Sequence, residues 1–270
     1  MFSEPLTEAT NNDTEGEKPD NKPCKVIKTL EQGDARKAAN TLYEAFQNDS
    51  LAKYLTVHIT DPEIRKELEI TLYECYLIQH IKLGLCLGIG EGADQFETVA
   101  LWALPEVEAK EDIDSFTHMM ECGFWKVWLE CDALAREKIF KHMFSLLHDT
   151  FVDIMATDSR FHHKNAYTLV YLGSTLAARG KGNVRKMFEY MFENYIDKSD
   201  NNIAYLELSS SKNIPIYEKF GFKFYKDICL GKQDNGEEGT DYAVMNVMIR
   251  DSFGRDWTKL VNNFDSKGKL

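Results

Sequence analysis

Two turns, each joining a strand to a helix, carry the residues of this sequence that can do chemistry. The segment Tyr167 to Gly173 predicts a strand, which runs into Arg179-Gly180-Lys181-Gly182-Asn183 and then a helix over Val184 to Tyr195. A second predicted strand, Ile203 to Ser209, runs into Asn213-Ile214-Pro215-Ile216-Tyr217-Glu218-Lys219-Phe220-Gly221-Phe222. Two such turns can together bind one phosphate-bearing ligand and act on it.

The first turn has the composition of an anion-binding site. A helix start leaves backbone N–H groups unpaired and carries the positive end of the helix dipole. The glycines at 180 and 182 let the backbone approach a phosphate, and Arg179 and Lys181 add positive charge. The turn is not a nucleotide P-loop, because Gly-x-x-x-x-Gly-Lys-Ser/Thr is absent. An ordinary basic surface turn is the alternative.

Taken together, the two motifs resemble the acetyl-CoA-binding core of the Gcn5-related N-acetyltransferases. The run Leu206 to Phe222 is similar to the puromycin N-acetyltransferase-like branch, where Leu-Glu-x-Ser is followed by Asn-x-Pro-x-Tyr-Glu-Arg/Lys-x-Gly-Phe. The segment Val99 to Pro105 resembles the apolar-Trp-x-x-Pro segment of the family. The order of predicted elements extends the resemblance from about Lys25 to Arg250.

Two positions of the first turn depart from the family pattern. The last position, usually Gly or Ala, is Val184, and Asn183 stands where an apolar residue is common. A β-branched side chain where the helix approaches pyrophosphate predicts crowding and weaker acetyl-CoA binding. This departure keeps open a different class of function, a non-catalytic acyl-CoA-binding protein of the same fold.

The resemblance implies direct attack of an amine on the thioester of acetyl-CoA. It assigns the backbone N–H of Ser174 to the thioester carbonyl and Tyr217 to protonation of the departing thiolate, a task that suits a phenol of ordinary pKa about 10. A core aromatic is the alternative for Tyr217, and a helix cap is the alternative for Asn213. The cofactor-binding residues that the resemblance predicts are Leu172, Ser174, Arg179, Gly180, Lys181, Gly182, Asn183, Val184 and Asn213.

An ammonium substrate also needs a base, because an amine of pKa near 10 is protonated at neutral pH. Glu207 is the leading candidate, since burial in the middle of a strand raises a carboxyl pKa toward a useful value. A carboxylate that anchors the fold or the charge of the substrate is the alternative role. Glu97, the pair His162 and His163, and an ordered water are the other candidates.

We expect the acceptor pocket to form from the helices that precede the first of these strands. Phe124, Trp125 and Trp128 recur there at helical spacing, which favours core packing, with an aromatic wall for a bulky amine as the alternative. The histidines on these helices lack the spacing of metal ligands, so no metal site is predicted; they are His118, His142 and His148.

Composition fits one domain that binds a cation more readily than a nucleic acid. The 270 residues are 43% hydrophobic and carry a net charge of −12, which repels phosphate backbones. Six scattered cysteines without a Cys-x-x-Cys pair predict free thiols. No apolar run is long enough to span a membrane, and no secretory signal is evident. We therefore expect a soluble cytoplasmic monomer or homodimer, with the nucleus as the alternative location.

The predicted fold is α/β (α+β), with a mixed, mostly antiparallel central sheet flanked by helices. We expect a disordered acidic segment over 1–23, one acetyltransferase domain over 24–250 with a helical insertion at about 111–155, and a tail over 251–270. The sequence therefore predicts an acetyl-CoA-dependent N-acetyltransferase for a small-molecule amine, with acetylation of protein Lys or N-terminal amines as the alternative reaction.

Overall fold

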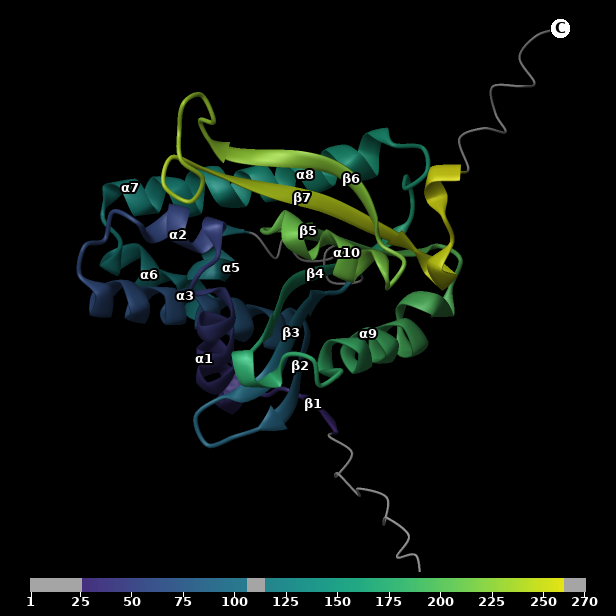
Figure 1. Ribbon diagram of the computed structural model, residues 1–270, viewed down its shortest axis with the longest axis horizontal. Coiled ribbons are helices and arrows are strands. Elements are labelled where there is room, and N and C mark those ends of the chain that lie inside the picture. The colour runs from purple at the N-terminus through teal and green to yellow at the C-terminus, as the bar shows by residue number, and fades with distance from the viewer. Residues whose placement is uncertain (1–25, 106–114, 260–270) are drawn as a thin grey trace, which may run out of the picture.

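A single mixed sheet forms the centre of the molecule (Figure 1). The computed structural model describes residues 26–105 and 115–259, so the segment predicted to be disordered lies outside it. The seven strands lie in the order β1-β2-β3-β4-β5-β7-β6, and every neighbouring pair is antiparallel except β4 and β5. The predicted mixed, mostly antiparallel sheet is confirmed. The strands are β1 (Ile27–Thr29), β2 (Gly84–Glu91), β3 (Phe96–Ala103), β4 (Asn165–Ser174), β5 (Asn202–Leu208), β6 (Lys223–Gly231) and β7 (Tyr242–Asp251).

Helices cover both faces of this sheet. Aspartates begin two of them, since Asp49 and Asp61 each accept hydrogen bonds from backbone N–H groups of the first turn that follows. The α-helices are α1 (Ala35–Phe46), α2 (Ser50–Thr56), α3 (Pro62–Leu83), α5 (Phe116–Met119), α6 (Trp125–Glu130), α7 (Ala133–Arg136), α8 (Phe144–Thr157), α9 (Asn183–Asn194) and α10 (Ile214–Glu218). Short 3₁₀ turns precede α1 and α10 and lie on either side of α9.

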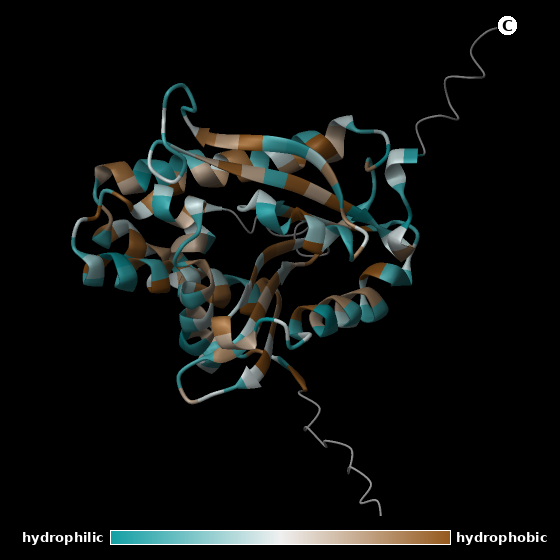
Figure 2. Cartoon of the chain, viewed as in Figure 1, coloured by the Kyte–Doolittle hydropathy of each residue, from teal (hydrophilic) through white to brown (hydrophobic). Residues whose placement is uncertain are grey.

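The hydrophobic core has two parts, one on each face of the sheet. One cluster packs α1, α2, α3 and the helices from α5 to α8 against the strands, and the other packs α9 and α10 against the opposite face. The strands alternate between these clusters, so Tyr205 belongs to the first, while Leu206 and Leu208 belong to the second. Figure 2 shows hydrophobic residues along the central strands and hydrophilic residues on the outer helix faces and loops.

The sheet opens between its two parallel strands. Pairing of β4 with β5 runs from Asn165 and Asn202 to Leu169 and Leu206, although both strands continue further. The register of β3 against β4 shifts at this point, which places an extra residue, Val170, in β4. A β-bulge bends and twists its strand, so the bulge and the end of pairing create a gap at the carboxyl ends of both strands.

The helices inserted between β3 and β4 are less regular than their apolar periodicity predicts. We expect two helices, over Ile113 to Trp128 and Ala133 to Val152, whereas each contains a wider π-helical turn, at Met120–Phe124 and Glu137–Met143. Gly123 has φ of +101°, a left-handed conformation that favours glycine and breaks the first helix. Residues before 115 in the first prediction lie outside the described residues.

The chain beyond the last strand returns to the core. Trp257 is buried, its indole N–H donates to the carbonyl of Ile249, and its ring packs against Phe161 and Tyr225. Arg160 lies 4.7 Å above the same ring. The described cysteines are all free thiols, as predicted; they are Cys75, Cys86, Cys122, Cys131 and Cys229.

Candidate active site

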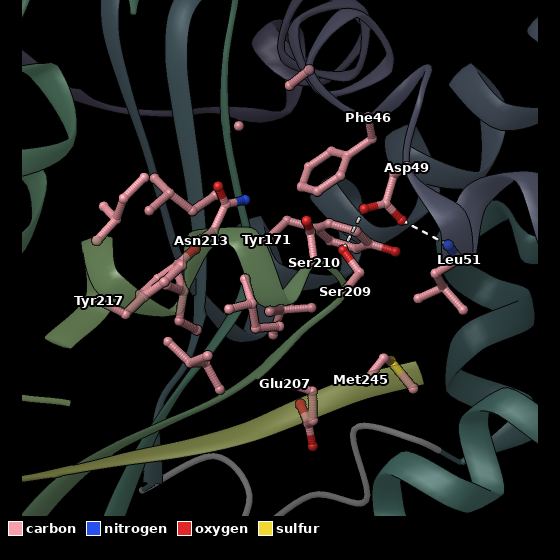
Figure 3. Close-up of a pocket in the computed structure, with 18 of the residues that line it drawn as sticks. Phe46, Asp49, Leu51, Tyr171, Glu207, Ser209, Ser210, Asn213, Tyr217 and Met245 are labelled. Atoms are coloured by element: carbon pink, nitrogen blue, oxygen red, sulfur yellow. Dashed lines mark hydrogen bonds between the residues drawn. The ribbon is translucent and has the colours of Figure 1, made fainter. Parts of the chain in front are cut away.

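A cavity of about 1450 Å³ occupies the gap between β4 and β5. Both strands line it, together with the turn before α9, the helices α8 and α10, the end of α1, the start of α2 and the loop between β6 and β7. Figure 3 shows side chains from these elements converging on the cavity, including Tyr171, Ser209, Asn213 and Tyr217. The two motifs that the sequence singles out therefore meet in one space.

The basic turn stands at one end of the cavity. Gly180 and Gly182 have φ of +78° and +80°, a backbone conformation that strains any other residue type. Open space lies around the position that a Cβ would take at either glycine. Arg179 lines the cavity, and α9 begins directly after Gly182. The turn thus presents a helix N-terminus, a bare backbone and a cation, which fits the phosphates of a coenzyme A ligand.

Asn183, unusual for the family at this position, anchors the turn to β3. Its side chain is buried, and its Nδ2 donates to Glu97 Oε2 at 3.0 Å and to Thr98 Oγ1 at 3.1 Å. Thr98 Oγ1 also lies 2.9 Å from Ser174 Oγ, and Lys181 Nζ lies 3.5 Å from Glu97 Oε1. Glu97, weighed above as an alternative base, thus holds the turn in place.

All but one of the predicted cofactor-binding residues line the cavity. The exception is Lys181, whose ammonium group pairs with Glu97 instead. Val184 lines the cavity and packs against the apolar cluster under α9, so its side chain is accommodated as part of the first helical turn. Leu172 packs against the same cluster from β4.

Tyr217 reaches the cavity from α10. Its ring is partly buried between Phe188 and Phe222, with edge-on contacts at centroid distances of 6.0 and 5.9 Å. Burial raises the pKa of the Tyr217 phenol well above its ordinary value. Like any phenol, Tyr217 is protonated at neutral pH, and the raised pKa makes it a weaker acid than a phenol of ordinary pKa.

Glu207 lies on a different wall of the cavity. It shares its face of β5 with Tyr205, which packs against Phe151 of α8. In Figure 3, Glu207 lies beside Met245, apart from Tyr217. Burial, together with the charge of Glu207, raises the pKa of the Tyr205 phenol far above its ordinary value.

Sequence reasoning missed Asp49 as a residue of the site. Its carboxylate accepts hydrogen bonds from the backbone N–H groups of Leu51 and Ala52, at 2.9 and 3.3 Å, and from Ser209 Oγ at 2.6 Å (Figure 3). Burial raises the pKa of Asp49 above its ordinary value. The pair Asp49-Ser50 was readable as a helix start, but nothing local places it beside a strand end 160 positions away.

We call the end of the cavity around Asp49 the acceptor end. Aromatic side chains line it, although they are not those that the sequence suggests. Phe124 is core, as expected, whereas Trp125 and Trp128 are 50% and 37% exposed and lie outside the cavity lining. Besides Tyr217 and Phe220 of the α10 region, the phenyl and phenol rings that line the cavity are Phe46, Tyr76, Phe144, Phe151, Tyr171 and Tyr205.

Of four histidines considered, two line the cavity and two lie outside its lining. His162 and His163 contact each other edge-on outside the lining, whereas His148 lines the cavity. His80, which the sequence did not single out, also lines it and is buried. Among residues 26–105 and 115–259, no group of three or more His, Cys, Asp or Glu side chains is arranged to hold a metal ion.

Comparison with known proteins places this geometry in a family. No family model matches the chain. A curated protein of Schizosaccharomyces pombe, named as an uncharacterized N-acetyltransferase, is 32% identical over 226 residues, which are 84% of this chain and 83% of the relative. At that identity and coverage, the chain belongs to the Gcn5-related N-acetyltransferases. The nearer resemblance to the puromycin branch stays a prediction.

Solved structures agree on the fold. Arylalkylamine N-acetyltransferase 2 of Aedes aegypti superposes with a TM-score of 0.53 at 13% identity, covering 84% of this chain and 98% of that one. The protein is thus an N-acetyltransferase of the family that uses acetyl-CoA as acetyl donor. In the part of the chain that the structure describes, no helix is both long and apolar enough to span a membrane.

Proposed function

We propose that this N-acetyltransferase transfers the acetyl group of acetyl-CoA to a small-molecule amine by direct attack on the thioester. The observation that carries the proposal is the wall that the inserted helices add to the cavity. Met143, Phe144, Leu147, Phe151 and Val152 of these helices line it together with β4 and β5. A cavity walled by helices and strands suits a compact substrate better than an extended peptide, which binds along an open groove.

The distribution of charge supports a cationic acceptor. Asp49, Glu207 and Glu238 line the cavity at α2, β5 and the loop between β6 and β7. The lysines and arginines of the lining stand at the turn, α9 and α10; they are Arg179, Arg185, Lys212 and Lys219. An anionic coenzyme and a cationic amine would each meet complementary charge in such a cavity. The Aedes aegypti structure belongs to an arylalkylamine N-acetyltransferase, which fits an aromatic-lined acceptor end.

Three groups take the chemical roles in this proposal. The backbone N–H of Ser174 donates to the thioester carbonyl, where it stabilises developing negative charge. Glu207 accepts a proton from the attacking nitrogen. Tyr217 donates its phenolic proton to the departing thiolate, a role supported by its position in the cavity lining.

The remaining predicted residues bind the coenzyme. We assign the phosphates to the backbone of Gly180, Gly182 and Val184 and to the charge of Arg179. Lys181 and Asn183 position this turn through Glu97 of β3. We assign Asn213, which lines the cavity before α10, to contact with the coenzyme arm, and Leu172 to packing beside it.

Thermal melting with and without saturating acetyl-CoA tests the first part of the proposal. Ligand at about 100 times its dissociation constant should stabilise the fold by about 2.7 kcal/mol, or several degrees. The double variant Arg179→Glu with Gly182→Asp should lose the shift, and Lys198→Glu, a charge reversal outside the cavity lining, should keep it. A folded wild type without any shift would overturn the proposed use of acetyl-CoA.

A thiol-release assay then tests the acceptor. A panel of arylalkylamines and diamines should release coenzyme A faster than peptides with a free N-terminus or Lys. Preference for the peptides would overturn the small-molecule assignment and leave the N-acetyltransferase itself intact.

A further inference from the structure

A second, much smaller cavity adjoins the acceptor end. It has a volume of about 30 Å³ and shares Phe46, Asp49, Leu51, Tyr171 and Ser209 with the main cavity. The polar side chains on its far side are Thr56, Glu69 and Tyr73. This space is large enough for one water molecule. Asp49 therefore stands between the substrate chamber and a polar compartment behind it.

The compartment contains a second carboxyl group. Glu69, on α3, is 8% exposed, and its Oε1 accepts a hydrogen bond from Thr56 Oγ1 at 2.7 Å. Among the described residues that line the small cavity, neither Asp49 nor Glu69 has a Lys, Arg or His beside it. Arg65, whose charge acts on Glu69, lies outside this lining. A cavity lined by two carboxyl groups and no cation is unusual, because burial disfavours the charged form and fold stability alone would favour an apolar residue.

The geometry of Asp49 leaves it able to accept a proton. One carboxylate oxygen accepts from the two backbone N–H groups of α2, and the other accepts from Ser209 Oγ. A carboxylate has about four acceptor positions, so three hydrogen bonds leave one. Ser209 lies at the end of β5, where its hydroxyl oxygen can accept a hydrogen bond from a group in the chamber while its proton points to Asp49.

We propose that Asp49 and Glu69 form a proton-accepting pair for the acceptor amine, connected to the chamber by Ser209 and to each other through the small cavity. The inference rests on the proposed function and adds a second base to it. Asp49 takes the first proton from the substrate ammonium, directly or through the Ser209 hydroxyl. A water in the small cavity passes that proton to Glu69.

The two protons that leave the nitrogen give each of the two bases a separate role. An ammonium substrate loses two protons as it becomes an amide: one leaves before the nitrogen attacks, and one leaves after the C–N bond forms. Glu207 takes the later proton, and Asp49 takes the earlier one. As the C–S bond breaks, the sulfur receives a proton from Tyr217, which is then reprotonated. One net proton passes to solvent, and every group returns to its starting state.

At neutral pH, the surroundings of both carboxyl groups favour proton uptake more than water does. Burial raises the pKa of Asp49, and the charge of Glu238 adds to the effect, while Ser209 and the backbone N–H groups of Leu51 and Ala52 oppose it. Burial also raises the pKa of Glu69, which the hydrogen bond from Thr56 and the charge of Arg65 oppose. The neighbouring phenols stay neutral at this pH; they are Tyr43, Tyr73 and Tyr171.

The pH profile of Asp49→Asn, with an amine that the wild type acetylates, tests the pair. Asparagine also caps helices, so α2 should remain folded. We expect kcat/KM to fall about 10²-fold at pH 7 and to recover toward the wild type near pH 10, where about half of the amine is already neutral in solution. Asp61→Asn, which alters the equivalent cap of α3, should behave as the wild type. A deficit of the same factor at every pH, or no deficit, would overturn the inference.

Two further variants separate the relay from a structural role. Glu69→Gln, which can still accept from Thr56, should show the same pH-dependent deficit with a smaller amplitude, and Ser209→Ala should leave part of the activity. Wild-type activity for Glu69→Gln at pH 7 would remove Glu69 from the inference. None of these variants should change the thermal shift that acetyl-CoA produces.

An infrared titration tests the pair even if no amine in the panel is acetylated. The wild type should keep a protonated-carboxyl band above about pH 5, beyond the ordinary range of Asp and Glu. Asp49→Asn and Glu69→Gln should each weaken it. A wild type without this band would contradict the inference, whereas its presence without turnover would count against the proposed function alone.

Discussion

The phenol of Tyr217 is the single group on which protonation of the thiolate depends in the proposed reaction. Phe188 and Phe222 enclose its ring while it still lines the cavity, and burial raises its pKa. We expect Tyr217→Phe to lower kcat by about 10²-fold or more, because the packing survives and only the donor is lost. Steady-state kinetics measures this. Tyr190→Phe, on α9 outside the cavity lining, is the control, and unchanged turnover in Tyr217→Phe would remove the acid assignment.

The buried imidazole of His80 should make the stability of the fold depend on pH. Burial lowers its pKa from about 6.5 to about 4, and its Nδ1 donates to the carbonyl of Tyr76. Between pH 6.5 and 4 the unfolded chain binds a proton that folded His80 does not, so stability falls as the pH falls through this window. The loss from this residue should reach about 3 kcal/mol at pH 4.

Denaturant unfolding at several pH values checks this expectation. His80→Gln, which keeps an N–H donor for Tyr76, should flatten the dependence between pH 6.5 and 4. His142→Gln, at a side chain 46% exposed, should leave it unchanged. Equal slopes for His80→Gln and the wild type would show that other groups control acid unfolding.

At the scale of elements, local patterns predicted the two strands that carry the motifs. β4 and β5 begin and end within two residues of the ranges expected from the sequence, because apolar patterns reflect which face is buried. The seven-residue helix α2 was missed, since it is too short to show a period. The bulge at Val170 was also missed, because it reflects how β4 leaves β5 and has no periodic signal.

The residues of the candidate site also fall into a group that local patterns predicted and a group that they did not. The basic turn and Tyr217 were predicted because each lies in a contiguous motif, and Glu207 because it interrupts an apolar strand. Asp49 bonds to Ser209, which is 160 positions away in the sequence. Glu97 bonds to Asn183, which is 86 positions away. Only the folded topology brings such residues together, so spacing along the chain could not indicate them.

The anchoring of α9 to β3 is the element-level contact that we expect to control coenzyme affinity. Asn183→Leu removes the donor to Glu97 and Thr98, which should destabilise the fold by about 1–3 kcal/mol. The turn before α9 should then lose its position, and the dissociation constant of acetyl-CoA should rise. Calorimetric titration measures it. Asn194→Leu, at the exposed end of the same helix, is the matched control, and equal affinities in both variants would make the anchor irrelevant to binding.

At the scale of the whole molecule, the opening that forms the site also weakens the sheet. Only the first half of β4, from Asn165 to Leu169, pairs with β5, so few strand hydrogen bonds join the two halves of the sheet. Other contacts must hold β5, β6 and β7 to the rest. Phe151 of α8 packs on Tyr205 of β5, and the Asp158 carboxylate accepts hydrogen bonds from Arg160 and from the Tyr225 hydroxyl of β6. The inserted helices therefore line the cavity and also connect the two halves of the sheet, a connection that we call the brace.

Trp257 completes this brace, and its removal tests the idea that the C-terminal segment stabilises the divided sheet. The indole fills a space between Phe161 and Tyr225 and bonds to the carbonyl of Ile249. Trp257→Ala should lower the free energy of unfolding by about 3–5 kcal/mol, as for other buried aromatic truncations. Denaturant unfolding measures the loss. Trp125→Ala, the same truncation at a half-exposed indole, should cost much less. Because Trp257 lies outside the cavity lining, folded Trp257→Ala should bind acetyl-CoA as the wild type does. Weakened binding in the folded variant would mean instead that the brace also sets the width of the opening between β4 and β5.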